Sequence, residues 1–95
     1  MSYLISRRSF LVGVASAFYA AYSASVAAGE RVLRAQRALR RLGYDPGPLD
    51  AVYGDQTERA VRRFQRNNRL APTGALNGPT VNELVRQVRR RRRWD

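Results

Sequence analysis

The sequence predicts an all-α fold, a compact domain of three helices with two similar loop-to-helix repeats. The repeats are residues 50–57, Asp-Ala-Val-Tyr-Gly-Asp-Gln-Thr, and residues 73–80, Thr-Gly-Ala-Leu-Asn-Gly-Pro-Thr. An apolar run with helical spacing follows each repeat, and a third such run precedes the first one. Strand signals are weak, because the triplets 51–53 and 74–76 are too short for more than a small bridge between the two loops.

The first helix is expected over residues 30–42, with Gly43 ending it in the left-handed conformation. The segment 45–48, Asp-Pro-Gly-Pro, then forces a turn, since proline lacks an amide donor and biases the preceding residue toward extended geometry. Tyr44 and Leu49 are expected to fold back onto the core. The apolar residues of this helix, at spacings of three and four, are Val32, Ala35, Leu39 and Leu42.

The second helix is expected to begin at Asp55, which together with Glu58 forms a capping-box pattern. The third is expected to begin near Pro79, whose missing amide is harmless in a first turn. The arginine run 89–93 should then fray into a basic tail, because adjacent like charges repel one another. The core residues expected from these segments are Ala60, Val61, Phe64, Val81, Leu84, Val85 and Val88, with Leu49, Val52, Leu70 and Leu76 from the loops.

Composition limits the chemistry of the chain. Its 95 residues suit one domain plus an appendage. All 18 basic residues are arginine, and with 7 acidic residues the net charge is +11, which favours an anionic partner. Cysteine and histidine are absent, so a disulfide, a thiolate nucleophile and an ordinary zinc or copper site are excluded. We expect no cofactor, no metal and no enzymatic activity.

Several elements in fixed order resemble the peptidoglycan-binding domain of cell-wall hydrolases, from about Val32 to Leu84. They are Leu-Gly-Tyr at 42–44, Gly-Pro at 47–48, the loop 50–57, and a helix with Ala-Val and Phe-Gln, after which the loop recurs. The sequence departs from the family pattern at Ala35, where leucine is usual, and at Ala51, Arg69 and Asn77, where glycine is usual. Asparagine tolerates a left-handed backbone, so the change at Asn77 is mild.

The resemblance implies a non-catalytic module that binds peptidoglycan, at its stem peptide or glycan. In that family the module usually targets a separate catalytic domain to the wall. The chain would then act alone as a wall-binding protein or recruit a separate cell-wall hydrolase. The arginine count alone suggests nucleic-acid binding, which the export signal described below opposes, so no nucleic-acid partner is expected.

The candidate ligand-binding residues are Asp50, Tyr53, Gln56, Arg63 and Gln65. Asp50, Tyr53 and Gln56 place a groove along the repeated loops, although Asp50 in a turn also suits bonds to nearby amides. Tyr53 offers an aromatic face to a sugar or peptide, or alternatively caps the core. Arg63 belongs to the helical arginines, which form a solvated face or bind stem-peptide carboxylates.

Two glutamines stand at the edge of the core, and they match family positions. They are Gln36 and Gln65, each directly after an inward-facing residue. At such a position a glutamine amide can join a loop carbonyl and a loop amide. The alternative is a direct ligand contact, for which Gln65 is the candidate.

The N-terminus predicts export. Residues 6–11, Ser-Arg-Arg-Ser-Phe-Leu, resemble the twin-arginine signal, and the uncharged stretch 10–28 ends in small residues that suit cleavage after Ala28. The general secretory pathway is an alternative route, and a retained membrane anchor over residues 10–28 is an alternative fate. The expected division is 1–28 signal peptide or anchor, 29–88 domain and 89–95 basic tail. The expected location is the periplasm or cell envelope.

The basic C-terminal residues suggest a second contact. An aromatic residue beside several arginines is typical of a segment that rests on anionic lipid or an envelope polymer. Solubility alone is the other interpretation. A membrane-tethered interaction protein is therefore the alternative to the peptidoglycan-binding interpretation. The residues concerned are Arg89, Arg90, Arg91, Arg92, Arg93 and Trp94.

Overall fold

The structure, a computed structural model, describes residues 25–94 and contains three helices and no strand within that range. The helices are residues 25–41, α2 (Asp55–Asn67) and α3 (Gly78–Trp94). The all-α, three-helix prediction is therefore confirmed. The small bridge between the two loops does not form in the described residues. The residues with the twin-arginine-like motif, and most of the uncharged stretch, lie outside the described range.

The first helix starts before the predicted residue 30 and ends one residue before the predicted Leu42. Gly43, at φ 92°, ends it in the left-handed conformation, as predicted. The amide of Tyr44 donates to the carbonyl of Leu39 at 2.8 Å, and the amide of Gly43 donates to the carbonyl of Arg40 at 3.1 Å. These bonds satisfy carbonyls that the helix end would otherwise leave without partners.

Helix α2 begins where the sequence predicts, but the capping box does not form. The N-cap residue is Gly54, which has no side chain to bind the first turn. Asp55 is thus the first helical residue, and the amide of Glu58 donates to the carbonyl of Gly54 at 3.0 Å. The carboxylate of Glu58 instead forms an ion pair with Arg62 at 2.7 Å. Asp55 still favours the helix through its negative charge near the N-terminal dipole.

The end of α2 repeats the geometry seen at Gly43 with a different residue. Arg69 takes the left-handed conformation at φ 58°, and the amide of Leu70 donates to the carbonyl of Gln65 at 2.8 Å. An arginine therefore occupies the left-handed position where the family usually has glycine. Because arginine has a Cβ, it is strained in this conformation, whereas glycine is not.

Helix α3 is capped by Asn77, which the sequence interpretation treated as a left-handed loop residue. Its side-chain oxygen accepts from the amide of Thr80 at 3.2 Å and from the Thr80 hydroxyl at 2.5 Å. Among residues 25–94, the non-glycine residues with positive φ are Ala51 and Arg69, so Asn77 is not left-handed. It is an N-cap, for which asparagine is among the preferred residues.

The arginine run continues α3 to Trp94, so the prediction that it frays is wrong. Successive helical residues point about 100° apart, which directs adjacent guanidinium groups away from one another. Arg91 donates to the carbonyl of Arg41 at the end of the first helix, which attaches this part of α3 to the domain. Basic side chains also suit the negative C-terminal end of a helix.

The core lies where the three helices meet, and Leu39, Val61 and Phe64 are fully buried in it. The ring of Tyr44 packs edge-on against that of Phe64, with centroids 5.6 Å apart. Leu49, Val52 and Val85, which the sequence places in the core, are 37%, 61% and 44% exposed, so these predictions are wrong. The remaining core residues are Ala35, Ala60 and Leu84, with Ala38, Leu42, Tyr44, Tyr53, Leu70 and Leu76 packed against them.

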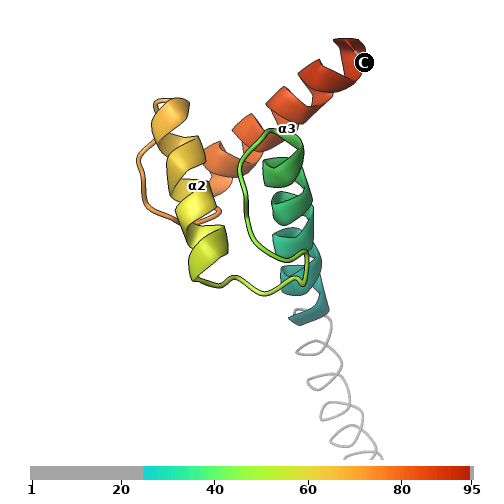
Figure 1. The fold of residues 1–95 in the computed structure, drawn as a ribbon, viewed down its shortest axis with the longest axis vertical. Helices are drawn as coiled ribbons and strands as arrows, with labels where there is room; N and C mark the ends of the chain where they lie inside the picture. Colours follow the sequence, from blue (N-terminus) through green and yellow to red (C-terminus); the bar gives the residue numbers. More distant parts are fainter. Residues whose placement is uncertain (1–24, 95) are drawn as a thin grey trace, which may run out of the picture.

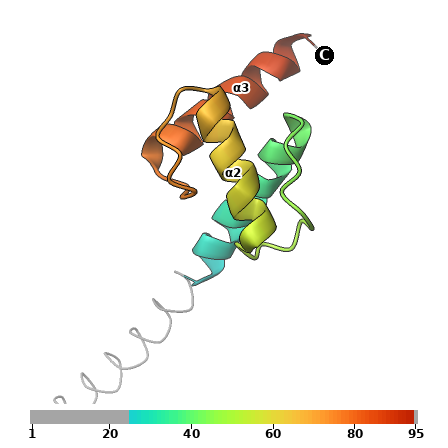
Figure 2. The same ribbon diagram turned by 60° about the vertical axis from the view of Figure 1, so that its left-hand side comes forward.

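The loop that joins the first helix to α2 runs back along the first helix, and the second loop returns the chain from α2 to α3 (Figure 1). In both views α3 projects beyond the other helices, at the end of the molecule away from residues 48–54 (Figures 1 and 2). The core cluster and all the hydrogen bonds described below lie within residues 29–94. The contacts that hold the three helices together therefore do not involve residues 25–28. Within residues 25–94, the structure has no helix with the length and hydropathy needed to span a bilayer.

Candidate functional site

A fully buried glutamine on the first helix holds the first loop. Nε2 of Gln36 donates to Oδ1 of Asp50 at 3.3 Å, to the Val52 carbonyl at 3.0 Å and to Oγ1 of Thr57 at 3.1 Å. Its Oε1 accepts from the amide of Ala51 at 3.0 Å. Gln36 and these four partners are called the first glutamine cluster. It confirms the prediction that this glutamine joins a loop carbonyl and a loop amide.

A second buried glutamine, on α2, holds the second loop in the same way. Nε2 of Gln65 donates to Oγ1 of Thr73 at 3.1 Å, to the Ala75 carbonyl at 3.0 Å and to Oγ1 of Thr80 at 3.0 Å. Its Oε1 accepts from the amide of Gly74 at 2.9 Å. Gln65 and these partners form the second glutamine cluster.

The two clusters give the sequence repeat a structural meaning. In each, the glutamine binds the loop at three consecutive residues and then the threonine of the following helix. The first of the three loop residues also accepts from an amide two residues on: Asp50 from Val52 at 2.9 Å and Thr73 from Ala75 at 3.2 Å. Among the described residues, no buried side-chain nitrogen or oxygen lacks a hydrogen-bond partner. The equivalent pairs are Gln36 and Gln65, Asp50 and Thr73, Ala51 and Gly74, Val52 and Ala75, and Thr57 and Thr80.

Burial removes one predicted ligand residue from the site. Gln65 is 0% exposed, and both atoms of its amide group are bonded within the second cluster. A ligand cannot reach this side chain without breaking the loop. Gln65 is therefore a loop-holding residue, as the structural interpretation of the sequence had it.

Tyr53 connects the two repeats. Its hydroxyl donates to the carbonyl of Gly74, and its ring packs partly buried against the core. Burial raises the pKa of Tyr53, and the nearby carboxylate of Glu58 raises it further. Tyr53 therefore caps the core, one of the two roles predicted for it, and part of its side chain remains exposed.

The other predicted residues are exposed. Asp50 accepts bonds from the Val52 amide and from Gln36, and these bonds lower its carboxyl pKa, the amide having the larger effect. Gln56 donates to Oδ2 of Asp45 at 3.2 Å. Arg63 lies on the outward side of α2. Asp50, Tyr53 and Gln56 therefore belong to one loop and the helix start that follows it, whereas within residues 25–94 no hydrogen bond or ion pair joins Arg63 to them.

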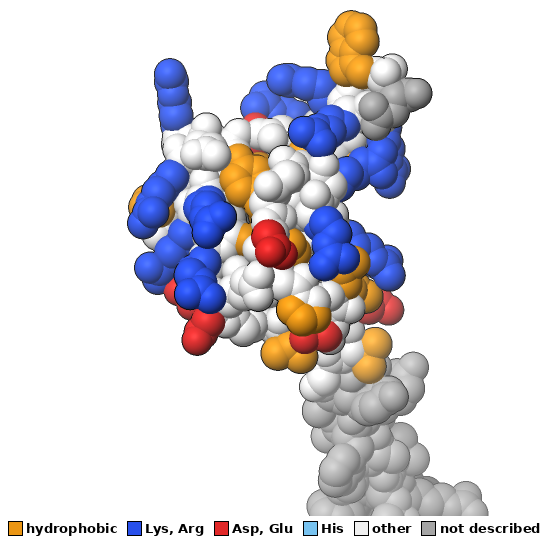
Figure 3. Space-filling model, in the orientation of Figure 1, with side chains coloured by type: hydrophobic (Ala, Val, Ile, Leu, Met, Phe, Trp, Pro, Cys, Tyr) orange, Lys and Arg blue, Asp and Glu red, His pale blue; other side chains and the backbone are white. Residues whose placement is uncertain are grey.

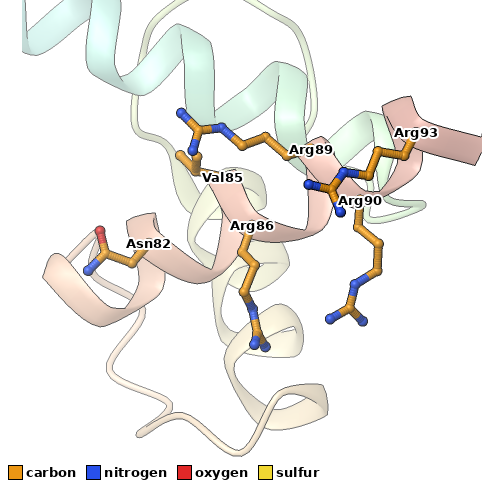
Figure 4. A pocket seen from close by; sticks show the side chains of 6 residues that line it. All are labelled: Asn82, Val85, Arg86, Arg89, Arg90 and Arg93. Atoms are coloured by element: carbon orange, nitrogen blue, oxygen red, sulfur yellow. The ribbon is translucent and has the colours of Figure 1, made fainter.

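Two surfaces were not predicted in full from the sequence. Leu49 and Val52 form exposed apolar positions on either side of Asp50, and the sequence assigned them to the core because of their hydrophobicity alone. Along α3, an open furrow of about 600 Å³ lies between outward-facing side chains (Figure 4). The signal for it was the three- and four-residue spacing of its lining, which is Asn82, Val85, Arg86, Arg89, Arg90 and Arg93.

Arginine side chains lie over α2, beside the first helix and around the projecting part of α3 (Figure 3). Within residues 25–94, no group of three or more histidine, cysteine or acidic residues is placed to hold a metal ion. The fold and the two glutamine clusters define a small helical module that presents two internally braced loops.

A sequence model of the peptidoglycan binding domain family matches residues 28–84, more than half of the chain. The chain therefore belongs to the peptidoglycan-binding domain family, a non-catalytic binding domain. It is 39% identical over 62 residues to the localization factor PodJL of Caulobacter vibrioides, an alignment with 65% of this chain and 6% of that protein. It is 33% identical over 63 residues to the carboxy-terminal processing protease CtpB of Bacillus subtilis, covering 66% of this chain and 13% of that protease.

The chain thus spans a small part of the length of these relatives. No solved structure matches the chain. The family match begins close to the predicted domain start at residue 29 and ends at residue 84, so residues 85–94 of α3 lie beyond it.

Proposed function

We propose that the chain is a non-catalytic module that binds peptidoglycan in the cell envelope. The observation that carries the proposal is that both repeated loops of this family member are braced by a buried glutamine. The first loop keeps its left-handed residue even though Ala51 replaces the usual glycine. This bracing supports the proposal that the two loops present an ordered surface to a ligand.

We place the binding surface on the first loop and the start of α2. Leu49 and Val52 supply exposed apolar contacts for the methyl groups of a stem peptide, and the Asp50 carboxylate between them suits an amine. Gln56 offers an exposed amide, and the exposed part of Tyr53 offers an aromatic face. Arg63 can bind a stem-peptide carboxylate with two parallel hydrogen bonds.

The proposal includes export and a role beside other proteins. Residues 6–11 resemble a twin-arginine signal, and residues 1–28 would serve as a cleaved signal peptide or an anchor. The relatives are named as a localization factor and as a processing protease, which supports a targeting role for domains of this kind. The chain would act alone or recruit a separate cell-wall hydrolase.

The test is retention of residues 29–95 on purified, insoluble peptidoglycan in roughly 150 mM salt, where exposed charges more than about 8 Å apart are screened. We expect Val52→Ser to lower the retained fraction and Val85→Ser to leave it unchanged. Both substitutions replace an exposed valine, at 61% and 44% exposure, so they are matched in chemistry. Complete loss of wild-type retention at this salt concentration would reduce the binding to charge alone and refute the proposal.

A second candidate function is a membrane-tethered protein that contacts anionic lipid. It is favoured by the exposed arginine face of α3, which the peptidoglycan proposal does not use. Recovery of the chain in the soluble periplasmic fraction without detergent would exclude tethering by residues 10–28.

A further inference from the structure

The C-terminal part of α3 is built differently from the rest of the domain. The buried residues of α3 are Thr80 and Leu84, both in its first half. The residues that follow, 85–94, include six arginines and no acidic residue. This part lies beyond the family match and projects from the domain (Figures 1 and 2).

One side of this projection gathers cations. Arg86, Arg89, Arg90 and Arg93 recur at spacings of three and four, which places them on one helix face. Figure 4 shows the side chains of Arg86 and Arg90 extending to one side of α3 and that of Arg89 extending to the other side. Arg86 forms an ion pair with Glu83 at 2.7 Å, and this hydrogen bond is the largest cause of the lowered pKa of Glu83.

Two of these arginines are available to an external anion. Among the described residues, neither Arg89 nor Arg93 has a hydrogen bond or an ion pair. A guanidinium group binds a phosphate with two parallel hydrogen bonds. The two residues are four positions apart, so their guanidinium groups can contact neighbouring phosphates on a surface.

The orientation of this face is fixed by a neighbour on another side of α3. Arg91 donates to the carbonyl of Arg41, so its guanidinium group lies against the end of the first helix. Asn82 to Arg93 covers a length of about 16 Å at the rise of an α-helix. The result is an ordered basic face rather than a disordered cationic tail.

The apolar residues beside this face favour a lipid surface over a soluble polyanion. Val85 borders the furrow and is 44% exposed, and Trp94, at the end of α3, is 85% exposed. An exposed tryptophan next to arginines suits the boundary between headgroups and acyl chains, where one part of the ring is wet and the other apolar.

We propose that α3 is a second binding surface, for the phosphates of an anionic phospholipid membrane, and that it acts at the same time as peptidoglycan binding. The two surfaces are separated, because residues 48–54 lie at the opposite end of the molecule from the projecting α3 (Figures 1 and 2). The chain would thus link the wall to a membrane. The wall half of this link rests on the proposed function, whereas the lipid half stands alone.

The lipid half is tested with residues 29–95 and vesicles of phosphatidylcholine with or without phosphatidylglycerol. Trp94 is the single tryptophan of the chain, so its emission reports directly on α3. We expect a blue shift and quenching by brominated acyl chains with the anionic vesicles only. Arg89→Gln with Arg93→Gln should lower the partition coefficient about 25-fold, or about fivefold for each arginine removed.

The matched control is Arg34→Gln with Arg37→Gln, which removes the same charge from exposed positions on the first helix. An equal loss in both double variants would mean that net charge alone binds the vesicles, and would overturn the proposal. An unchanged Trp94 emission would also overturn it. So would complete displacement of the protein from vesicles by double-stranded DNA at equal phosphate concentration, because the surface would then bind any polyanion.

The link itself is tested by sedimenting purified peptidoglycan with dye-labelled anionic vesicles. We expect vesicles in the pellet only when the protein is present, and fewer with the Arg89 and Arg93 double variant. Binding to vesicles without binding to peptidoglycan would refute the proposed function and leave the lipid surface standing. Binding to peptidoglycan without vesicles would refute the lipid surface, and mutual competition would refute the simultaneous link.

Discussion

The left-handed residue of each glutamine cluster gives the sharpest test of how the loops are held. Ala51 has φ 63° and Gly74, its equivalent, has φ 76°. In each case the amide of this residue donates to Oε1 of the cluster's glutamine. The two residues have the same left-handed backbone conformation, but one is alanine and the other is glycine. Ala51→Gly and Gly74→Ala should therefore change stability in opposite directions.

The magnitudes follow from the backbone and from the space at each site. The left-handed conformation costs a non-glycine residue about 1–2 kcal/mol. Glycine offsets part of this gain, because its unfolded chain has greater conformational freedom, which lowers stability by about 0.5–1 kcal/mol. Ala51→Gly should therefore increase the free energy of unfolding by about 0.5–1 kcal/mol.

Gly74→Ala should destabilise the domain by more than Ala51→Gly stabilises it, because a steric clash adds to the backbone strain. A Cβ at Gly74 would lie 2.7 Å from Nε of Arg62 and 2.9 Å from Cγ of Glu58, so the ion pair would have to move. Gly74→Ala should lower the free energy of unfolding by about 1 kcal/mol or more.

The assay is urea and thermal unfolding of residues 29–95, followed by far-ultraviolet circular dichroism. For a domain of this size, about 1 kcal/mol corresponds to a change of about 4–8 °C in Tm. Arg69→Gly provides a parallel, since φ is 58° there and the side chain is exposed. A fall in Tm for Ala51→Gly, or shifts of the same sign at Ala51 and Gly74, would refute the account of the loops.

Three further predictions concern the hydrogen bonds. Gln65→Glu should destabilise the domain by about 3 kcal/mol near pH 7, because a buried carboxylate would face the acceptors that now bind the amide. The loss of stability caused by Gln65→Glu should shrink as the pH falls toward about 4.3, where the introduced carboxyl becomes protonated in the unfolded chain. The control is urea unfolding of Gln65→Leu, whose stability loss should not depend on pH in this way. Asn77→Ala should remove the α3 cap and cost about 1 kcal/mol in the same assay, and an unchanged Tm would contradict the cap. Because the pKa of Asp50 is lowered in the folded state, the stability that its carboxylate adds is complete above the unfolded-state pKa and is lost as the pH falls through the folded-state pKa. An NMR titration of the Asp50 carboxyl carbon should give a midpoint below 3.8. Gln36→Leu should raise that midpoint, because it removes one of the hydrogen bonds that lower the pKa.

The sequence predicted what depends on local pattern. Apolar spacing located the helices, and the repeat together with its two glutamines predicted loops joined to the core edge. The N-cap of α2 was misplaced by one residue, because Gly54 and Asp55 are adjacent and both can cap a helix. Asn77 was recognised as unusual but given the wrong role, since its partner Thr80 depends on where α3 begins.

The errors over exposure have a different cause, which lies in contacts between distant residues. Val52 directs its carbonyl inward to Gln36, and its side chain is accordingly exposed, although hydrophobicity alone places it in the core. The arginine run was expected to fray, but Arg91 finds the carbonyl of Arg41, far away in the sequence. Gln36 indicated a bond to a loop carbonyl without showing which one, and the contact between Arg91 and Arg41 leaves no signal in the residues nearby.

Polar bracing also explains how so small a core can support a binding surface. The buried apolar cluster has six residues, all on the helices, and Tyr44 and Tyr53 of the first loop pack against it. Gln36 satisfies the loop backbone from within, which leaves Leu49 and Val52 facing solvent without exposing unsatisfied amides or carbonyls. A loop held by apolar packing would have to bury these side chains. The same glutamine that fixes the loop is therefore what leaves its apolar residues exposed, as the proposed binding surface requires.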